Sequence, residues 1–264
     1  MLALAACVNE SNQQKRETCR EAADEELADA GDECAEQNAA RLALCKQLGE
    51  ARYDPRINPA NFVNPLKIGK SVLPNPYHPL VPGSVWVYQG PEERIRVEVT
   101  DQTKEILGIT AIVVRDVVMD DEGELVEDTD DWIAQDNEGN VWYFGELSRS
   151  YEDGELVSLE GSWTAGIDGA RPGILFEANP AVGDLYRQEF LPGEAEDLGK
   201  VLRLDGQATV PATRCNSACV VTADFSPLEP DARERKFYAP NVGLILELEE
   251  GERVELVRYR IGNE

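Results

Sequence analysis

The chain has 264 residues, which is enough for one large domain or two small ones and for a sizeable hydrophobic core. Acidic residues outnumber basic residues 51 to 25, so the formal net charge is −26 at pH 7. This charge repels phosphate backbones and anionic membrane surfaces, which excludes nucleic acid binding. The acidic excess itself fits a solvated coat, adaptation to high salt, or attraction of cations such as calcium.

Residues 1–6, with the sequence MLALAA, are typical of the end of an export signal, because an apolar run finishes in small residues. Leu4 to Cys7 also resemble a bacterial lipobox, in which Cys7 would carry a lipid anchor. The alternative is a plain export signal that is cut just before Cys7. No run approaches 18 apolar residues, so no transmembrane segment is expected. We therefore expect an exported protein, located in the periplasm, on the cell surface or outside the cell.

Residues 7–50 contain four cysteines and predict a disulfide-bonded helical hairpin. The spacings from Cys7 to Cys19 and from Cys34 to Cys45 are each close to three helical turns, so both cysteines of a helix share one face. Gly31 in ADAGDE supplies the turn. An antiparallel hairpin then pairs Cys7 with Cys45 and Cys19 with Cys34. This pairing competes with the lipid anchor for Cys7 and is favoured because it accounts for all four thiols.

Residues 51–82 form an extended connector, since they carry seven prolines and no amphipathic period. From residue 83 to 264, apolar and polar residues alternate, and β-branched and aromatic residues are frequent, which predicts antiparallel strands. The expected strands include VWVY, RIRVEVT, ITAIVVRDVV, LVEDTDDWIA, VWYFGEL and LVSLEGSW. Cys215 and Cys219 are expected to close a small disulfide loop at a strand end.

Four turns share one chemistry, DDEGE, DNEGN, YEDGE and EEGER, with acids or Asn before a glycine, as in tight hairpin turns. Two segments also resemble later ones: PGSVWVYQG resembles VGDLYRQEF, and DWIAQDNEGNVWYFGE resembles KFYAPNVGLILELEE. The later segments follow the earlier ones by 100 and about 105 residues, which predicts two similar β units, about 83–160 and 181–260. The predicted fold class is mainly β, an antiparallel half-barrel or sandwich-like domain of two units with an N-terminal disulfide-bonded helical hairpin.

The phrases NPYHPLVPGSVWVYQG, DNEGNVWYFGE, GSWTAGIDGARPGILF and YAPNVGLILE resemble an uncharacterised family of exported bacterial β-rich proteins, over about residues 74 to 250. The first two phrases and the last are similar, more weakly, to the open half-barrels of lipoprotein-carrier and related periplasmic proteins. That similarity implies a curved antiparallel sheet with an apolar ligand in its concave face. It implies nothing for the cysteine segment.

Multi-histidine metal centres are excluded, because His78 is the single histidine in the chain, and its place in a proline-rich connector favours a packed or exposed polar residue over a catalytic one. Asp128 and Asp130 share a strand face with Trp132, and Glu146 lies across the expected hairpin, an arrangement that a carboxylate-dependent hydrolase could use. The same acid-rich stretch offers Asp128 and Asp130 as weak candidates for calcium ligands, although it lacks the spacing of an EF-hand loop. Ordinary hairpin turns explain this cluster of acidic residues more simply than a calcium site does.

The loop GSWTAGIDGARPGI places Trp163, Asp168 and Arg171 among four glycines, and a long ordered loop in a compact domain is often functional. The alternative is structural: Arg171 pairs with Asp168, and Trp163 covers the core. Both alternatives remain open from sequence.

The expected function is a non-enzymatic exported binding or carrier protein of unknown ligand, without a cofactor. Trp86, together with the six candidate ligand-binding residues, would line its concave sheet: Trp132, Trp142, Trp163, Asp168, Arg171 and Tyr186. Its partner would be a small molecule or another protein. One rival is a calcium-stabilised interaction or matrix protein. A second rival is the carboxylate-dependent hydrolase.

Overall fold

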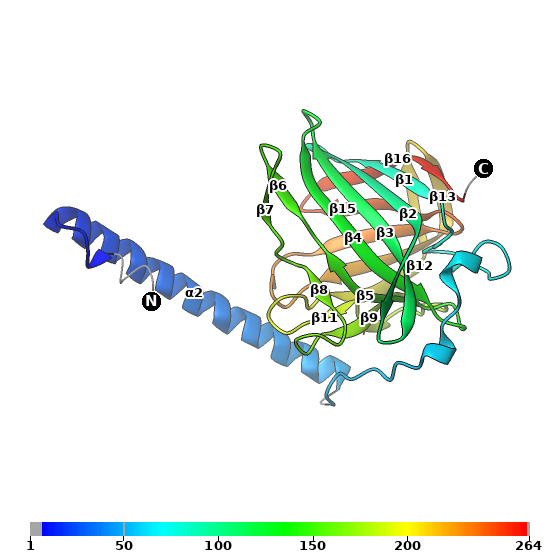
Figure 1. The fold of residues 1–264 in the computed structure, drawn as a ribbon, viewed down its shortest axis with the longest axis horizontal. Coiled ribbons are helices and arrows are strands. Elements are labelled where there is room, and N and C mark those ends of the chain that lie inside the picture. The colour runs from blue at the N-terminus through cyan, green and yellow to red at the C-terminus, as the bar shows by residue number, and fades with distance from the viewer. Residues whose placement is uncertain (1–6, 50, 263–264) are drawn as a thin grey trace. The chain divides into compact units, whose positions relative to one another are not determined.

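The computed structural model describes residues 7–49 and 51–262, and they form two compact units that divide at residue 50. The first unit contains helix α2, Gln13–Leu48. The second unit contains the connector and the β-sheet (Figure 1).

Residues Gln13–Leu48 of the first unit form one continuous helix of 36 residues, so the predicted helical hairpin is wrong. Asn12 caps its start by accepting a hydrogen bond from the Lys15 backbone N–H at 3.1 Å. The helix runs through Gly31 without a turn and ends at Gly49, which has a φ of 91°. Ala, Glu, Leu and Arg on both sides favour helix, and one interior glycine costs only about 1 kcal/mol. Ala23 and Leu44 are the buried residues of α2, so two antiparallel arms would have had little apolar surface to bury.

The disulfide pairing in this unit also differs from the prediction. Cys7 is bonded to Cys19, with 5.6 Å between their Cα atoms, whereas Cys34 and Cys45 are free and exposed. Cys7 precedes the helix, so the bond ties the incoming chain back to the first turns of α2. A lipid thioether at Cys7 would use the same sulfur atom, so the two modifications exclude each other.

The second unit is mainly β, as predicted. Its described strands form one sheet of 16 strands, in which every ladder between strands is antiparallel, in the order β10-β12-β13-β14-β15-β16-β1-β2-β3-β4-β5-β9-β11 with β6, β7 and β8 attached to the side. The strands are β1 Val85–Gln89, β2 Glu93–Ile106, β3 Ile109–Asp120, β4 Leu125–Gln135, β5 Val141–Leu147, β6 Ser150–Glu152, β7 Glu155–Ser158, β8 Trp163–Thr164, β9 Arg171–Phe176, β10 Leu185–Arg187, β11 Glu189–Phe190, β12 Leu198–Val210, β13 Thr213–Phe225, β14 Glu234–Ala239, β15 Gly243–Glu249 and β16 Glu252–Arg260.

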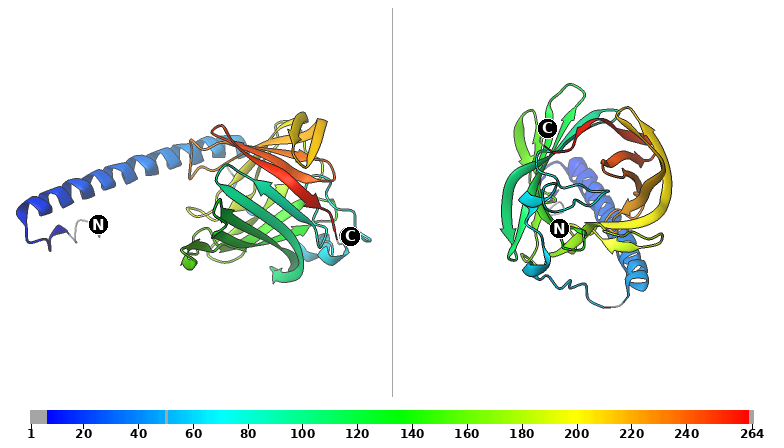
Figure 2. Two further views of the ribbon diagram at one scale, coloured as in Figure 1. Left: turned by 90° about the horizontal axis from the view of Figure 1, so that it is seen from above. Right: turned by 90° about the vertical axis from the view of Figure 1, so that its right-hand side faces the viewer.

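The sheet curves into a nearly closed barrel (Figure 2). The first strand β1 pairs with the last strand β16, which joins the two halves of the sheet on one side. On the other side, the two ends of the strand order are β10 and β11, and these are consecutive in the chain. Each half contains a long hairpin, β2–β3 in one and β12–β13 in the other. One long hairpin in each half is consistent with two similar units, and the duplication stays a prediction.

Glycines with positive φ occupy the predicted turns, where residues with a Cβ are disfavoured. Gly123, Gly139, Gly154 and Gly251 have φ values of 85°, 95°, 77° and 96°. Cys215 and Cys219 are bonded as predicted, but they lie inside β13 instead of at a strand end. They pair with Ala208 and Gly206 of β12, so the residues between them form a bulge.

The connector packs against the sheet through two 3-10 turns, η1 Pro59–Asn61 and η2 Pro65–Lys67, and through the buried side chains of Ile68 and Leu80. Asn75 is the main polar anchor. Its backbone N–H donates to Gln135 Oε1 at 2.9 Å, and its Nδ2 donates to the carbonyl oxygens of Gly139 and Glu177. These bonds satisfy a buried amide and hold the segment that carries His78 against the inner face of the sheet.

Candidate functional site

The curved sheet lines a cavity of about 320 Å³ that is partly open to solvent. Its apolar wall comes from both halves of the sheet and from the connector. The apolar and aromatic residues that line it are Pro79, Leu80, Trp86, Tyr88, Val97, Val99, Val114, Ile133, Tyr143, Leu175, Tyr238, Gly243 and Leu244. Trp86 Nε1 donates to the Val242 carbonyl oxygen at 2.7 Å, and the Tyr88 hydroxyl donates to the Leu244 carbonyl oxygen at 3.1 Å, so these rings are fixed in the wall.

Carboxylates form the rest of the lining. They belong to strands or strand ends on all sides of the cavity: Asp116, Asp131, Glu189, Asp197, Asp224 and Glu247. Lys236 on β14 is the one Lys or Arg among the described residues that line the cavity. The interior is therefore acidic as well as apolar, whereas the sequence suggested a mainly aromatic lining with Asp168 and Arg171.

Lys236 is shared by three carboxylates. Its Nζ lies 3.1 Å from Glu234 Oε2, 3.6 Å from Glu247 Oε1 and 3.7 Å from Asp224 Oδ2. Burial alone would lower the pKa of Lys236, but these carboxylates raise it well above its usual value. Burial raises the pKa of Glu247 to about 7 even beside this ammonium group. Lys236 is thus charged at neutral pH, and its ammonium group is shared among these three carboxylates.

Asp131 on β4 and Glu146 on β5 face each other in the ladder and form the centre of a second acidic group. The Tyr143 hydroxyl donates to Asp131 Oδ1 at 2.5 Å. Burial, only partly offset by this hydrogen bond, raises the pKa of Asp131 to about 7. Burial and the nearby Asp131 charge raise the pKa of Glu146 to about 8. Burial and the charge of Glu146 also raise the pKa of Glu189 well above its usual value.

Asp116 on β3 stands apart from both groups. Its Oδ1 is buried and accepts no hydrogen bond from any described residue. The residues opposite it in the ladders are Val97 on β2 and Thr129 on β4. Val97 is apolar, and the Thr129 hydroxyl donates to Glu127 Oε1 at 2.8 Å, so neither neighbour supplies a donor. Burial first, and then the charge of Asp131, raise the pKa of Asp116 well above its usual value.

His78 lines the cavity next to Lys236. Burial and the Lys236 charge lower the pKa of His78 to about 4, so its imidazole is neutral at pH 7. It therefore adds no positive charge to offset the acids.

The six predicted ligand-binding side chains are spread around the β unit, and the cavity lining contains none of them. Trp132 is buried on the opposite face of β4 from Asp131 and Ile133, with Lys104 Nζ 2.9 Å from its ring centroid. Trp142 contacts Phe62 of the connector and donates to Asp136 Oδ2 at 2.9 Å.

Trp163 and Tyr186 are buried, and Trp163 packs edge to face against Tyr143 with 5.4 Å between ring centroids. Asp168 is exposed at a turn. Arg171 does not pair with Asp168; its Nε donates to Asp54 Oδ1 at 2.8 Å. The glycine-rich segment around them contains strands β8 and β9 and so is partly regular structure.

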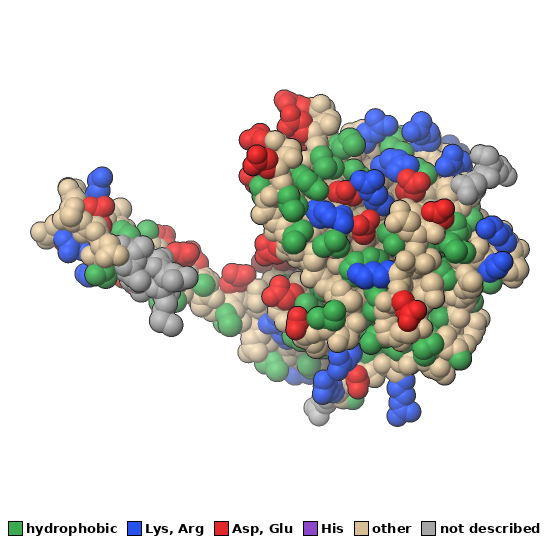
Figure 3. Space-filling model, in the orientation of Figure 1, with side chains coloured by type: hydrophobic (Ala, Val, Ile, Leu, Met, Phe, Trp, Pro, Cys, Tyr) green, Lys and Arg blue, Asp and Glu red, His purple; other side chains and the backbone are tan. Residues whose placement is uncertain are grey.

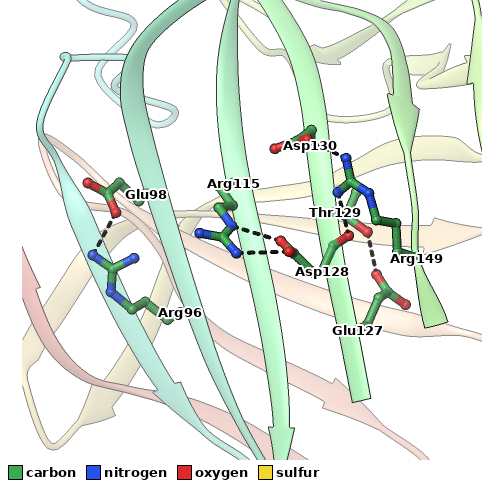
Figure 4. A network of polar contacts seen from close by, with 8 residues as sticks. All are labelled: Arg96, Glu98, Arg115, Glu127, Asp128, Thr129, Asp130 and Arg149. Atoms are coloured by element: carbon green, nitrogen blue, oxygen red, sulfur yellow. Dashed lines mark hydrogen bonds and ion pairs between the residues drawn. The ribbon is translucent and has the colours of Figure 1, made fainter. Parts of the chain in front are cut away.

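Asp128 and Asp130, the weak calcium candidates, lie on the outer face of β4 and pair with arginines (Figure 4). Both oxygens of Asp128 accept from Arg115 at 2.8 Å, and Asp130 Oδ2 accepts from Arg149 at 2.8 Å. Within the described ranges, no group of three or more His, Cys, Asp or Glu side chains could hold a metal ion. The acid that faces Glu146 is Asp131, whose side chain leaves β4 on the other side from Asp130.

The residues that sequence reasoning missed are Asp116, Asp131, Glu189 and Lys236. A signal for two of them was present, because Asp116 follows Val114 and Asp131 precedes Ile133 at the two-residue period of an inward strand face. A charged residue at an inward position is unusual and marks a site. Glu189 and Lys236 have no such local signal.

No protein-family model and no curated protein matches the chain. Among solved structures, a "putative lipoprotein" from Parabacteroides distasonis aligns with a TM-score of 0.40 and 14% identity, covering 71% of this chain and all of that one. A "putative exported protein with YmcC-like fold" from Bacteroides fragilis aligns with a TM-score of 0.41 and 12% identity, covering 70% of this chain and 98% of that one. TM-scores of 0.40 and 0.41 with identities of 14% and 12% assign no function to this chain. No helix in residues 7–49 or 51–262 is long and apolar enough to span a bilayer.

Proposed function

We propose that the protein is an exported, non-enzymatic binding or carrier protein that holds a small molecule inside the curved sheet. The observation that carries this proposal is the cavity of about 320 Å³, which lies inside the usual range for small-molecule sites. An apolar wall interrupted by a few polar side chains is the usual composition of such sites. The wall rings are held by hydrogen bonds to the backbone, so the cavity is preformed.

Native purification followed by mass spectrometry of the denatured protein tests this function. We expect a small molecule in a defined ratio to the chain. Val114→Trp on β3 fills the cavity and should remove the molecule, whereas Thr110→Trp places the same side chain at an exposed position of the same strand and should retain it. Recovery of the same molecule from both variants, or of none from the wild type, would contradict the proposal.

Export is supported by the two disulfides, because such bonds persist in oxidising compartments. A thiol titration checks both the compartment and the pairing. The chain purified from its native compartment and unfolded without reductant should show two reactive thiols of the six cysteines, at Cys34 and Cys45. Peptide mapping should recover Cys7 joined to Cys19. Recovery of Cys7 joined to Cys45 would restore the hairpin, and six free thiols would argue against export.

A second candidate function, hydrolysis by paired carboxyl groups, is favoured by the raised pKa values of Asp131, which lines the cavity, and of Glu146, which lies opposite it. Incubation of the isolated molecule with the protein distinguishes the two. A binding protein returns the molecule chemically unchanged. A hydrolase converts it, and Glu146→Gln then lowers the rate at least 100-fold.

A further inference from the structure

The cavity has an unbalanced set of charges. Six carboxyl groups line it against one ammonium group, and that ammonium already lies within 4 Å of three carboxylates. Asp224 is satisfied further, because it accepts from Thr222 Oγ1 at 2.6 Å and from Gln188 Nε2 at 3.1 Å. Asp116, Asp131 and Glu189 are left without a cationic partner among the described residues. A cation entering the cavity would meet carboxyl groups that no described Lys or Arg pairs with.

Asp116 gives the most direct sign of a missing partner. A buried carboxylate oxygen without a hydrogen bond costs free energy, and native proteins retain few of them. Its neighbours in the two ladders offer no donor, as the Thr129 hydroxyl is committed to Glu127. Asp116 itself lines the cavity and is only partly buried, so a ligand can reach its carboxyl group.

The walls around these acceptors suit an organic ion better than a simple one. Val97, Val99 and Val114 surround Asp116 with apolar surface on β2 and β3. The rings of Trp86, Tyr88 and Tyr238 also face the space, and aromatic faces attract cations. An apolar body with a cationic end matches both features.

We propose that the ligand of this cavity is a small organic cation, with an ammonium or guanidinium group on an apolar body, and that Asp116 and Asp131 accept hydrogen bonds from its N–H groups. This inference rests on the proposed function and names the class of molecule that the same cavity takes.

Binding of such a cation should depend on pH. The titratable and charged groups that face the cavity are Tyr88 on β1, Asp116 on β3, Asp131 on β4, Tyr143 on β5, Glu189 on β11, Asp197 before β12, Asp224 on β13, Lys236 and Tyr238 on β14, Glu247 on β15 and His78 in the connector. Raised pKa values mean that some carboxyl groups carry protons in the empty cavity at pH 6. A cation must displace these protons, so its affinity should fall about tenfold from pH 8 to pH 6.

Three probes with one apolar body test the inference: octylammonium, octanol and octanoate, titrated into the wild-type chain by calorimetry at pH 8. We expect octylammonium to bind at least tenfold more tightly than octanol and octanoate to bind most weakly. Equal affinities for octylammonium and octanol would overturn the cation inference while leaving the proposed function intact. Absence of binding by all three probes would also overturn the cation inference, and the co-purification experiment then decides the proposed function separately.

Two neighbouring aspartates on β4 give a matched pair of variants. Asp131→Asn removes a charge that faces the cavity, and Asp130→Asn removes one that faces outward. Asp131→Asn and Asp116→Asn should each weaken octylammonium about tenfold and leave octanol unchanged, while Asp130→Asn should change neither. Equal effects of the two β4 variants would show a general charge effect and overturn the inference. Near-UV circular dichroism checks folding, and the wild-type probe series decides the question even if a variant fails to fold. Calcium chloride is a fourth probe, and its competition with octylammonium would overturn the organic-cation assignment.

Discussion

The outer and inner faces of the curved sheet carry carboxylates in different electrostatic surroundings. On the outer face, acids pair with arginines, either across adjacent strands, as Asp128 on β4 does with Arg115 on β3, or along one strand, as Glu98 does with Arg96 on β2 (Figure 4). Lys and Arg side chains also lie among Asp and Glu side chains on the visible surface (Figure 3). On the inner face, six acids line the cavity, and Lys236 is the one Lys or Arg among the described lining residues. Folding alone would not favour an uncompensated interior, and this difference is the basis of our proposal that the inner acids bind a ligand.

The largest effect is expected when the inner face loses its cation. Lys236→Met removes the cationic partner of Glu234, Asp224 and Glu247 in a largely buried place. This should lower the free energy of unfolding by about 3 kcal/mol at pH 7. Urea unfolding measures this. Arg115→Met on the outer face is the control and should cost about 1 kcal/mol or less. Equal losses for the two variants would remove the contrast between the faces.

The next effect concerns pH. Asp131 has a folded pKa of about 7 and Glu146 one of about 8, both above their ordinary values, so between about pH 4 and pH 8 the folded state holds more protons than the unfolded state. Stability is therefore present at mildly acidic pH and is lost as pH rises through this window. The midpoint of urea unfolding should fall from pH 5 to pH 8.

Asp131→Asn should flatten that fall and stabilise the protein at pH 8 by at most about 4 kcal/mol, because a neutral amide replaces a carboxyl group that ionises at a cost. Asp130→Asn, one residue away on the outer face, should leave the slope unchanged. A midpoint that rises with pH in the wild type would contradict the raised pKa values.

The smallest effect is expected on the outer face. A double-mutant cycle of Arg115→Met and Asp128→Asn should give a coupling free energy of about 0.5 kcal/mol, because half of the Arg115 side chain is exposed to solvent. The coupling should decrease in 1 M NaCl, where screening is strong. A salt-independent coupling above about 2 kcal/mol would mean that the outer pairs resemble the inner ones.

The period of the sequence predicted the strands and their turns well, because alternation and glycine placement are local properties. It also placed Asp128, Asp130 and Trp132 correctly on one strand face. It could not say which face of β4 lines the cavity, because Trp132 is buried on the outer side beneath Lys104. The aromatic residue Trp132 therefore led to the wrong face of β4 being predicted as the ligand-binding face.

The helical hairpin failed for a different reason. A spacing of three turns between cysteines fits two short helices and one long helix equally well. The choice depends on whether two arms can bury apolar surface, and the exposed side chains of α2 do not provide it. Lys236 and Glu189 could not be predicted as site residues. Lys236 lies near Asp224, and Glu189 near Glu146, only because the sheet brings together strands that are distant in sequence.

The two ends of the strand order, β10 and β11, belong to one short run of chain from Leu185 to Phe190. Free sheet edges expose unpaired N–H and C=O groups that can recruit strands from other molecules. Here each edge is only three or two residues long. Edges this short offer few unpaired groups, so edge-to-edge aggregation of this large antiparallel sheet is disfavoured.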